Sequence, residues 1–320
     1  MKKRKLGNSA LEVSPLCLGG NVFGWTADEP TSFQLLDSFV AAGFNFIDTA
    51  DSYSTWAPGH KGGESESVIG DWLKARGNRD QVIIATKVGL EVMGRKGLSK
   101  AYILSEVEES LARLQTDYID LYQSHRDDPG TPVDETLEAY AQLVRQGKVR
   151  AIGASNFTSD RLGQSLAAGR KHGYPVYESL QPNYNLYERA DYETNLEALC
   201  LKERLAVIPY FPLASGFLTG KYRSESDLAK SSRGQFVKKY VNDRGFRILQ
   251  ALEEAAKQHH STPAKVSLAW LIARPSVTAP IASATSLGQL NDLIEAPSLQ
   301  LDHSTLESLN RASAYSAAAG

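Results

Sequence analysis

Hydrophobic residues along this chain gather in short continuous runs, and the stretches between the runs often have the spacing of amphipathic helices. Eight runs favour β structure and lack regular polar alternation, which is typical of parallel strands covered on both faces. They predict strands within residues 14–19, 44–50, 81–88, 118–125, 149–155, 177–183, 206–213 and 277–283.

Helical patterns separate these runs, for example in residues 33–43, 66–77 and 104–114. The clearest helix lies within residues 131–147. Its signals are Thr131 as N-cap, Pro132 at the first position, Asp134 three residues after the cap, and Gly147 at the end.

Eight strands that are each followed by a helical segment indicate an α/β fold, the (β/α)₈ TIM barrel. An open, doubly wound sheet is the competing arrangement, but eight regular units with no second-domain break favour closure. The turn signal at Gly7 and Asn8 predicts an N-terminal β-hairpin. We therefore expect one barrel domain over residues 1–320, with a long mobile loop at residues 220–236.

The charge balance argues against a nucleic-acid partner. The 35 basic and 37 acidic side chains leave a formal net charge of -2, whereas nucleic-acid binding needs a strongly basic face. No apolar run is long enough to cross a bilayer, so no membrane partner is expected. The basic start is followed by no apolar segment, which argues against a secretory signal.

The cysteines and histidines suggest a location and exclude a metal site. Cys17 and Cys200 show no pairing pattern, which suits the reducing cytosol. The six histidines lack metal-ligand spacing. We therefore expect a cytoplasmic protein that binds no metal.

Ionisable residues stand where three neighbouring predicted strands end. The second strand ends in Asp48 with Tyr53 in the loop, the third ends in Lys87, and the fourth ends in His125. Each has an ordinary structural explanation when taken singly, such as a turn cap or a satisfied core histidine. Their occurrence at one end of adjacent strands, where barrel active sites lie, makes a shared function the better explanation.

These four side chains form a chemically sensible set. A phenol titrates at roughly 10, too high for easy proton exchange near neutrality. We expect Lys87 to lower the pKa of Tyr53, and Asp48 to keep Lys87 charged and in place. His125 would hydrogen-bond the same substrate oxygen, so that Tyr53 becomes the proton donor to a developing alkoxide.

The chain resembles the aldo-keto reductases, a family whose Asp, Tyr, Lys and His tetrad stands in this order at these strand ends. The resemblance covers essentially the whole chain. It rests on the segments FNFIDTADSY, GESESVIGDWL, IIATK, DLYQSHR, IGASNF, QPNYN and PYFPLASGFLTGKY. It implies NAD(P)H-dependent, reversible reduction of aldehydes and ketones to alcohols, with small-molecule carbonyl substrates.

The resemblance also implies a nicotinamide dinucleotide bound without a Rossmann fold, consistent with the absence of G-x-G-x-x-G after the first strand. Ser155, Asn156 and Gln181 would hydrogen-bond the nicotinamide amide, and Tyr210 would stack on its ring. Leu213 and Ser215 would contact the pyrophosphate. The residues expected near the adenosine half are Ser283, Thr285, Gln289 and Asp292.

The choice between the two cofactors rests on one loop. Family members that use NADPH usually place a Lys or Arg at the ribose phosphate, but no basic residue occurs from Ala279 to Asp292. A charged fork is the best partner for such a phosphate. The family favours NADP(H) and the missing cation favours NAD(H), which leaves a slight preference for NADP(H).

Trp25, Trp56 and Arg126 follow strands one, two and four, and they are the expected substrate-pocket residues. Aromatic walls suit the apolar body of a carbonyl compound, and Arg126 would attract an anionic one. Core packing is the alternative for the tryptophans.

Two other functions stay open on the sequence. Lys87 would form a Schiff base in a class I aldolase-like enzyme, although its carboxylate partner would keep the amine protonated. A cofactor-sensing regulatory subunit is the second alternative, although the chain offers no large apolar extension for a partner.

Overall fold

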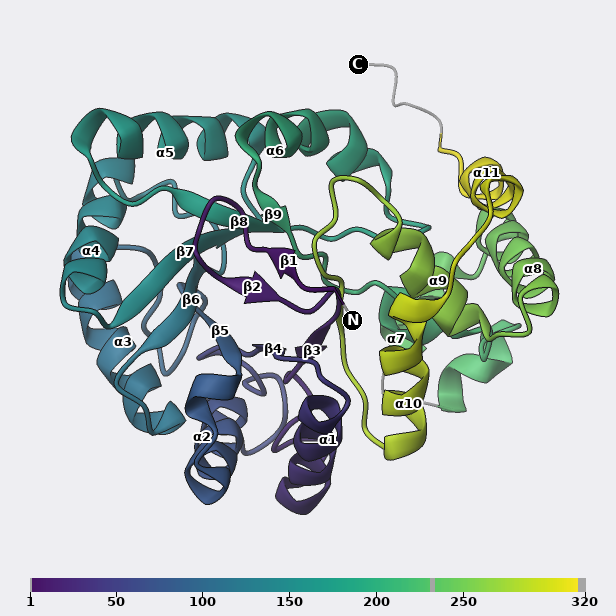
Figure 1. The fold of residues 1–320 in the computed structure, drawn as a ribbon, viewed down its shortest axis with the longest axis horizontal. Coiled ribbons are helices and arrows are strands. Elements are labelled where there is room, and N and C mark those ends of the chain that lie inside the picture. Colours follow the sequence, from purple (N-terminus) through teal and green to yellow (C-terminus); the bar gives the residue numbers. More distant parts are fainter. Residues whose placement is uncertain (1, 231–233, 316–320) are drawn as a thin grey trace.

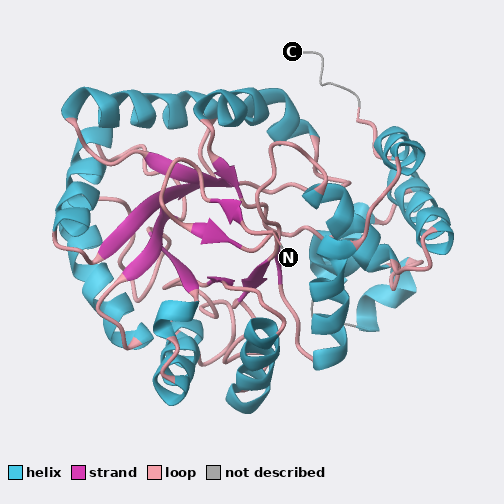
Figure 2. Ribbon diagram, viewed as in Figure 1, coloured by secondary structure: helices cyan, strands magenta, loops and turns pink. Residues whose placement is uncertain are grey.

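Eight parallel strands form a barrel in this computed structural model, which describes residues 2–230 and 234–315 (Figures 1 and 2). The strands follow one another around the barrel in chain order, with the last strand beside the first. They are β3 (Cys17–Gly19), β4 (Phe46–Asp48), β5 (Ile83–Val88), β6 (Ile119–Ser124), β7 (Val149–Ser155), β8 (Tyr177–Gln181), β9 (Ala206–Val207) and β10 (Ile281–Ala282). All eight strands predicted from the sequence are present.

Contacts between β9 and the segment leading into β10 close the barrel. Val207 forms a parallel bridge with Val277, and its carbonyl oxygen accepts from the backbone N–H of Thr278 at 2.8 Å. Ile281 N donates to Pro209 O at 2.9 Å. The fold is therefore the expected (β/α)₈ barrel.

Helices surround the strands, as Figure 2 shows. They are α1 (Glu29–Ala41), α2 (Glu64–Arg76), α3 (Lys100–Leu114), α4 (Val133–Arg145), α5 (Ser159–His172), α6 (Glu197–Glu203), α7 (Gly234–Val237), α8 (Asp243–Gln258), α9 (Pro263–Ile272), α10 (Leu287–Glu295) and α11 (His303–Ala312). Among the described helices, none has both the length and the apolar content needed to cross a bilayer.

Two local expectations need correction. Helix α4 begins at Val133 with Pro132 at the cap position, and the Thr131 hydroxyl donates to Asp128 instead of capping the helix. Residues 220–236, expected to form a long loop, contain a 3₁₀ helix at Glu225–Lys230 and the start of α7. Residues 231–233 of that segment lie outside the described residues.

The N-terminal hairpin, β1 (Arg4–Lys5) and β2 (Glu12–Val13), lies across one end of the barrel (Figure 1). Leu6 and Val13 are fully buried there and belong to the same apolar cluster as the inward-facing strand residues Phe46 and Leu121. The predicted hairpin thus covers the end of the barrel at which the strands begin. The functional groups lie at the other end, where the strands finish.

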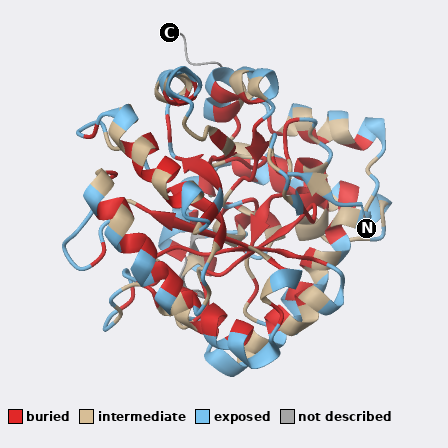
Figure 3. Ribbon diagram, turned by 60° about the vertical axis from the view of Figure 1, so that its left-hand side comes forward, coloured by how far each residue is buried: buried red, intermediate tan, exposed pale blue. Residues whose placement is uncertain are grey.

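The main core lies between the strands and the helices, and buried residues follow the strands and the inner helix faces in Figure 3. Trp72 of α2 and Trp270 of α9 are among its largest fully buried side chains. Burying a large apolar side chain contributes about 1.5–3 kcal/mol, so this layer holds the helices in place and gives the strand ends a rigid base.

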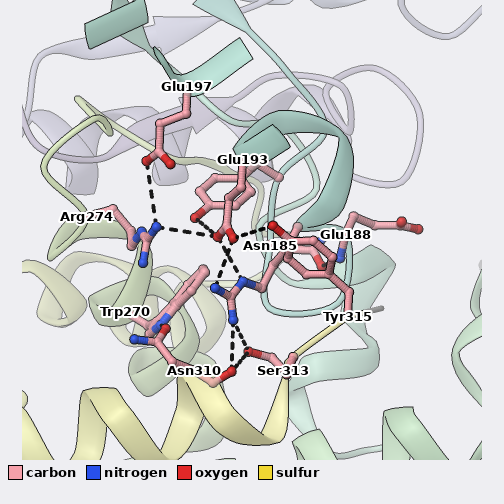
Figure 4. A network of polar contacts seen from close by, with 12 residues as sticks. Asn185, Glu188, Glu193, Glu197, Trp270, Arg274, Asn310, Ser313 and Tyr315 are labelled. Atoms are coloured by element: carbon pink, nitrogen blue, oxygen red, sulfur yellow. Dashed lines mark hydrogen bonds and ion pairs between the residues drawn. The ribbon is translucent and has the colours of Figure 1, made fainter. Parts of the chain in front are cut away.

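A polar network fastens residues 310–315, the last that the structure describes, to the loop after β8 (Figure 4). The buried Arg189 guanidinium donates to both carboxylate oxygens of Glu193, at 2.8 and 3.0 Å. It also donates to Asn310 O at 3.0 Å and to Ser313 Oγ at 2.8 Å. Tyr315 Oη donates to the same Glu193 carboxylate at 3.1 Å. The segment after α11 is therefore tied to a loop that begins at the candidate site.

Candidate active site

Parallel pairing brings the four predicted catalytic residues to one end of the barrel. Asp48 is the last residue of β4, and Lys87 is one residue from the end of β5. His125 directly follows β6, and Tyr53 lies in the turn after β4. Since parallel strands all finish at the same edge, residues far apart in sequence meet there.

Asp48, Tyr53 and Lys87 contact one another directly. Lys87 Nζ donates to Asp48 Oδ2 at 2.6 Å, to Tyr53 Oη at 2.7 Å and to Thr49 O at 2.8 Å. Tyr53 Oη donates to Asp48 Oδ2 at 2.9 Å. An ammonium group has three N–H donors, so every hydrogen of Lys87 has an acceptor.

The second oxygen of Asp48 is held by two amides. Gln181 Nε2 donates to Asp48 Oδ1 at 3.0 Å, and Gln123 Nε2 donates to the same oxygen at 3.2 Å. Both amide side chains and the carboxylate are buried, and a buried carboxylate needs such partners. Gln123 was not among the predicted site residues, although an amide inside a continuous apolar strand run was a usable signal.

The pKa of Tyr53 moves in the opposite direction to the expectation. Burial raises the pKa of this hydroxyl well above its usual value, and the charge and hydrogen bond of Asp48 raise it further. The expectation was wrong because it considered only Lys87 and left out the burial of the phenol and the charge of Asp48, which accepts from the hydroxyl. Tyr53 is therefore protonated at neutral pH and able to donate.

His125 is half-buried and stands beside the other three groups. Its ring centroid lies 6.1 Å from that of Tyr53, and its Nδ1 lies 3.3 Å from Ser52 Oγ. Burial lowers the pKa of His125 well below its usual value, and the positive charges of Lys87 and Arg126 add to this. The imidazole is therefore neutral. Ser52 was missed by the sequence analysis and had no distinguishing signal there.

A cavity of about 490 Å³ opens over these groups. Tyr53, His125, Trp56 and Arg126 line it. Trp25 does not line it and packs edge-on against Trp56 instead, with the ring centroids 5.6 Å apart. Of the three residues predicted for the substrate pocket, Trp56 and Arg126 therefore line the cavity, and Trp25 contacts Trp56 without lining it. Phe211 and Leu90, which were not predicted, also line the cavity.

The four residues expected to hold the nicotinamide ring line the same cavity. Ser155 and Gln181 are paired neighbours at the ends of β7 and β8. Asn156 follows in a left-handed conformation at φ 55°, and its Oδ1 accepts from Tyr210 Oη at 2.8 Å. Amide, hydroxyl and aromatic groups thus converge on one wall.

A second cavity, of about 580 Å³, adjoins the first and shares Asn21, Phe211, Ile281 and Ser283 with it. The remaining predicted cofactor residues line this second cavity, namely Leu213, Ser215, Ser283, Thr285, Gln289 and Asp292. The ten predicted cofactor residues therefore border one continuous space.

The second cavity contains a cation that the sequence analysis did not assign. Lys221 lines it, and its Nζ lies 3.2 Å from the position that a Cβ on Gly216 would take. Lys265 does not line the cavity but pairs with Asp292, which does, since its Nζ is 3.1 Å from Asp292 Oδ1 and 2.6 Å from Glu295 Oε2. A third cation, Arg274, does not line this cavity and pairs with Glu193 and Glu197 instead.

The residues present fit a nicotinamide dinucleotide. The inner cavity offers hydrogen-bonding groups for a carboxamide and a flat ring for stacking. The outer cavity offers the cation Lys221 beside the turn at Gly216, whose residues Ala214, Ser215 and Gly216 all have positive φ. Within the described residues, no group of three or more histidine, cysteine or acidic side chains is arranged to hold a metal ion.

Comparisons with known proteins agree on one protein family. A sequence family described as the aldo/keto reductase family matches residues 15–314. The uncharacterized oxidoreductase YrpG of Bacillus subtilis is 37% identical, over 97% of this chain and 95% of that protein. The aldo-keto reductase YhdN of the same organism is 31% identical, over 97% and 93% of the two chains. Protein tas of Escherichia coli is 32% identical, over 96% of each chain.

Proposed function

Because this chain belongs to the aldo/keto reductase family and is therefore an NAD(P)H-dependent oxidoreductase, we propose that it reduces aldehydes and ketones with Tyr53 as general acid. The observation that carries the proposal is the mutual contact of Lys87 Nζ, Asp48 Oδ2 and Tyr53 Oη, all within 2.9 Å of one another. A protonated phenol held beside an ammonium is able to give up its proton and to be stabilised afterwards.

The protein groups have separate tasks in the reaction. The chemistry that a bound NAD(P)H would supply is a hydride, with its electron pair, for the carbonyl carbon. The Tyr53 hydroxyl turns from Asp48 toward the carbonyl oxygen and gives it the proton that completes the alcohol. Lys87 stabilises the phenolate left behind, and solvent returns a proton to Tyr53. The same groups serve alcohol oxidation in reverse.

His125 orients the substrate in this proposal. A neutral imidazole whose Nδ1 accepts from Ser52 Oγ carries its hydrogen on Nε2. That N–H is then a donor to the carbonyl oxygen. The low pKa of His125 supports this role, because a neutral ring leaves Tyr53 as the sole proton source.

For the cofactor, we propose that the enzyme accepts both NADP(H) and NAD(H), with a slight preference for NADP(H). Ser155, Asn156, Gln181 and Tyr210 would hold the nicotinamide end. The residues proposed for the remainder of the cofactor are Leu213, Ser215, Ser283, Thr285, Gln289 and Asp292. Lys265 lies 3.1 Å from Asp292 and 2.6 Å from Glu295, so its charge offsets part of the repulsion that these two carboxylates would exert on a ribose phosphate.

Replacing Tyr53 with phenylalanine tests the proposal. The variant keeps the aromatic ring and loses the hydroxyl group that would donate the proton. Turnover of 4-nitrobenzaldehyde with NADPH should therefore fall by roughly 10²–10⁴-fold. Cofactor affinity, measured by quenching of protein fluorescence, should stay the same. Equal turnover by the variant and the natural enzyme would refute the role of Tyr53. Failure of the natural enzyme to reduce any of a broad aldehyde panel with either cofactor would refute the function.

The Schiff-base alternative has no support from this arrangement. All three hydrogens of Lys87 are donated to acceptors, and a buried carboxylate lies 2.6 Å from the nitrogen. An amine in this setting stays protonated and is not a nucleophile.

A further inference from the structure

We propose that Arg126 forms a carboxylate-binding subsite at the inner cavity, so that the preferred substrates are carbonyl compounds that also carry a carboxylate. The inference rests on the proposed function and deepens it, because it names a substrate class for the same site. It is carried by the position of Arg126, by its lack of a partner, and by the residues that surround it.

Arg126 belongs to the same cavity wall as the reacting groups. It directly follows His125 at the end of β6 and lines the inner cavity together with Tyr53. Its side chain is exposed to solvent. A guanidinium at this place can contact one end of a substrate whose carbonyl lies at Tyr53.

The guanidinium of Arg126 makes no hydrogen bond and no ion pair with any residue that the structure describes. Its acidic neighbours in sequence are engaged elsewhere. Asp127 Oδ1 accepts from Arg161 Nε at 2.8 Å, and Asp128 accepts from Thr131 Oγ1 and Leu98 N at 2.6 and 2.9 Å. The charge of Arg126 is therefore available to a ligand.

No other side chain of the cavity neutralises this charge. Glu91 is the one carboxylate among the described lining residues, and it pairs with Lys96 at 3.2 Å. Burial is the main cause of the low pKa of His125, and the positive charges of Lys87 and Arg126 lower it further. Burial raises the pKa of Tyr210, and the charge of Arg126 opposes that rise. Its field therefore reaches two residues that line the same cavity.

The rest of the cavity suits the carbon body of such a substrate. Trp56, Phe211 and Leu90 provide apolar walls. Arginine presents a planar fork that matches a carboxylate in two parallel hydrogen bonds. An aromatic or short aliphatic aldehyde with a carboxylate combines both features, and a neutral aldehyde uses only the first.

The cofactor does not need Arg126 for its phosphates. The cation beside the turn at Gly216 is Lys221, and it lines the outer cavity, whereas Arg126 lines only the inner one. The two positive charges thus serve two different anions in this arrangement.

Paired substrates of nearly the same shape test the subsite. The natural enzyme, Arg126→Gln and Arg126→Lys are assayed with NADPH, and kcat/KM is measured for 4-carboxybenzaldehyde and for its uncharged methyl ester. The 2- and 3-carboxy isomers are measured alongside, because they vary the distance between the two groups. Arg145→Gln is the control, because Arg145 is exposed, has no partner among the described residues and lies outside both cavities.

We expect the natural enzyme to prefer at least one acid isomer over its ester by roughly tenfold, since the site is exposed and screened. Arg126→Gln should abolish that ratio, Arg126→Lys should retain part of it, and Arg145→Gln should leave it unchanged. High salt should reduce the ratio of the natural enzyme. A direct readout without turnover is the affinity for 4-(hydroxymethyl)benzoate, which should fall in Arg126→Gln.

Two outcomes would overturn the subsite. One is an acid-to-ester ratio that is the same in Arg126→Gln as in the natural enzyme for all isomers. The other is a loss of NADPH affinity in Arg126→Gln without a change in that ratio, which would assign Arg126 to the cofactor. Absence of turnover with both acids and esters would instead refute the proposed function itself.

Discussion

At the scale of single residues, the site depends on how one carboxylate is shared. Asp48 Oδ2 accepts from Lys87 and Tyr53, and Oδ1 accepts from two buried amides. Because each oxygen is saturated, Asp48 is held without freedom to rotate. The phenol and the ammonium are thereby fixed next to each other, and the protonation states of Tyr53 and His125 follow from burial and from these neighbours.

The first prediction concerns pH. The pKa of Tyr53 is raised, so its protonated form, which reduction needs, persists up to high pH and is lost only above that pKa. The pKa of His125 is lowered, so its neutral form persists down to a pH well below 6.5. We expect kcat/KM for reduction of a neutral aldehyde to be flat between about pH 6 and 9. An inflection near 6.5 that disappears in His125→Gln would contradict this assignment.

The second prediction concerns Ser52, the only described side chain that contacts the His125 ring nitrogen Nδ1. In the proposed arrangement, Ser52→Ala removes the hydroxyl that would hold the His125 tautomer with hydrogen on Nε2. Loss of one hydrogen bond is worth about 1 kcal/mol, so kcat should fall roughly fivefold, and Ser52→Thr should restore part of it. Nitrogen NMR shifts of the His125 ring should report a mixed tautomer in Ser52→Ala.

Ser54→Ala is the matched control, since the buried Ser54 hydroxyl has no partner among the described residues. It should change neither kcat nor the ring shifts. Identical shifts in Ser52→Ala and the natural enzyme would show that Ser52 does not set the tautomer.

At the scale of elements, close backbone approach decides which residues the helices tolerate. Helix α2 passes so near α3 that a Cβ on Gly70 would lie 2.1 Å from Arg113 O. In α5, a Cβ on Gly163 would meet no atom within 4 Å. Both glycines occupy helix interiors, so sequence alone treats them as equivalent.

These two glycines give the third prediction. In an open helix position, alanine is more favourable than glycine by about 0.8–1.0 kcal/mol, so Gly163→Ala should raise the free energy of unfolding. Gly70→Ala should lower it by roughly 1–3 kcal/mol, because the clash is with backbone and the helices must separate. Urea denaturation of both variants measures the difference. A stabilised Gly70→Ala would show that α2 and α3 are not in this close contact.

The fourth prediction concerns Lys221, which lies beside the left-handed turn at Gly216 and far in sequence from Thr285. If Lys221 contacts the pyrophosphate, then Lys221→Met should weaken NADPH and NADH by a similar factor of about ten. The Lys202→Met variant serves as control, because Lys202 is exposed on α6. Fluorescence quenching gives both dissociation constants.

The same fluorescence titrations test how the protein binds the ribose phosphate that only NADPH carries. Ser286→Arg should tighten NADPH and leave NADH nearly unchanged, because only NADPH carries the additional phosphate. The natural enzyme should bind the two cofactors within about one decade of each other. If Lys221→Met weakened the binding of NADPH alone, Lys221 would be assigned to the ribose phosphate. The proposed placement of the pyrophosphate at Lys221 would then be wrong.

At the scale of the whole molecule, the last described residues, up to Tyr315, are held by charge as well as by apolar packing. Arg189 is buried, and the ring centroids of Trp270 and Tyr315 lie 5.4 and 5.7 Å from its guanidinium carbon. Its carboxylate partner, Glu193, also accepts from Tyr315. This network joins α11 to the loop after β8, the strand that supplies Gln181.

The fifth prediction follows from that network. Glu193→Gln leaves a buried guanidinium without its counter-charge, and breaking a buried pair in this way costs about 3–5 kcal/mol. The free energy of unfolding should fall by an amount in this range, measured in urea. Glu109→Gln, on the exposed face of α3, should change it by less than about 0.5 kcal/mol. Equal effects of the two variants would show that the network adds no stability.

The sequence by itself determined the barrel and the residues at its strand ends. Continuous apolar runs identify parallel strands, and parallel strands finish at one edge, so Asp48, Lys87 and His125 were expected together before any coordinates. All eight strands and the hairpin were confirmed. Local pattern suffices for these features because a continuous apolar run is a property of neighbouring residues, and strands that are consecutive in sequence usually lie side by side.

Only the tertiary structure decided the contacts across the barrel. Gln123 and Ser52 join the site because β6 and the turn after β4 lie beside other segments, and Lys221 reaches the outer cavity from a region expected to be a loop. The direction in which the Tyr53 pKa moves also depended on the burial of the phenol and on the charge of Asp48 beside it. Distances between residues remote in sequence set these energies, and electrostatic interactions depend steeply on distance and burial.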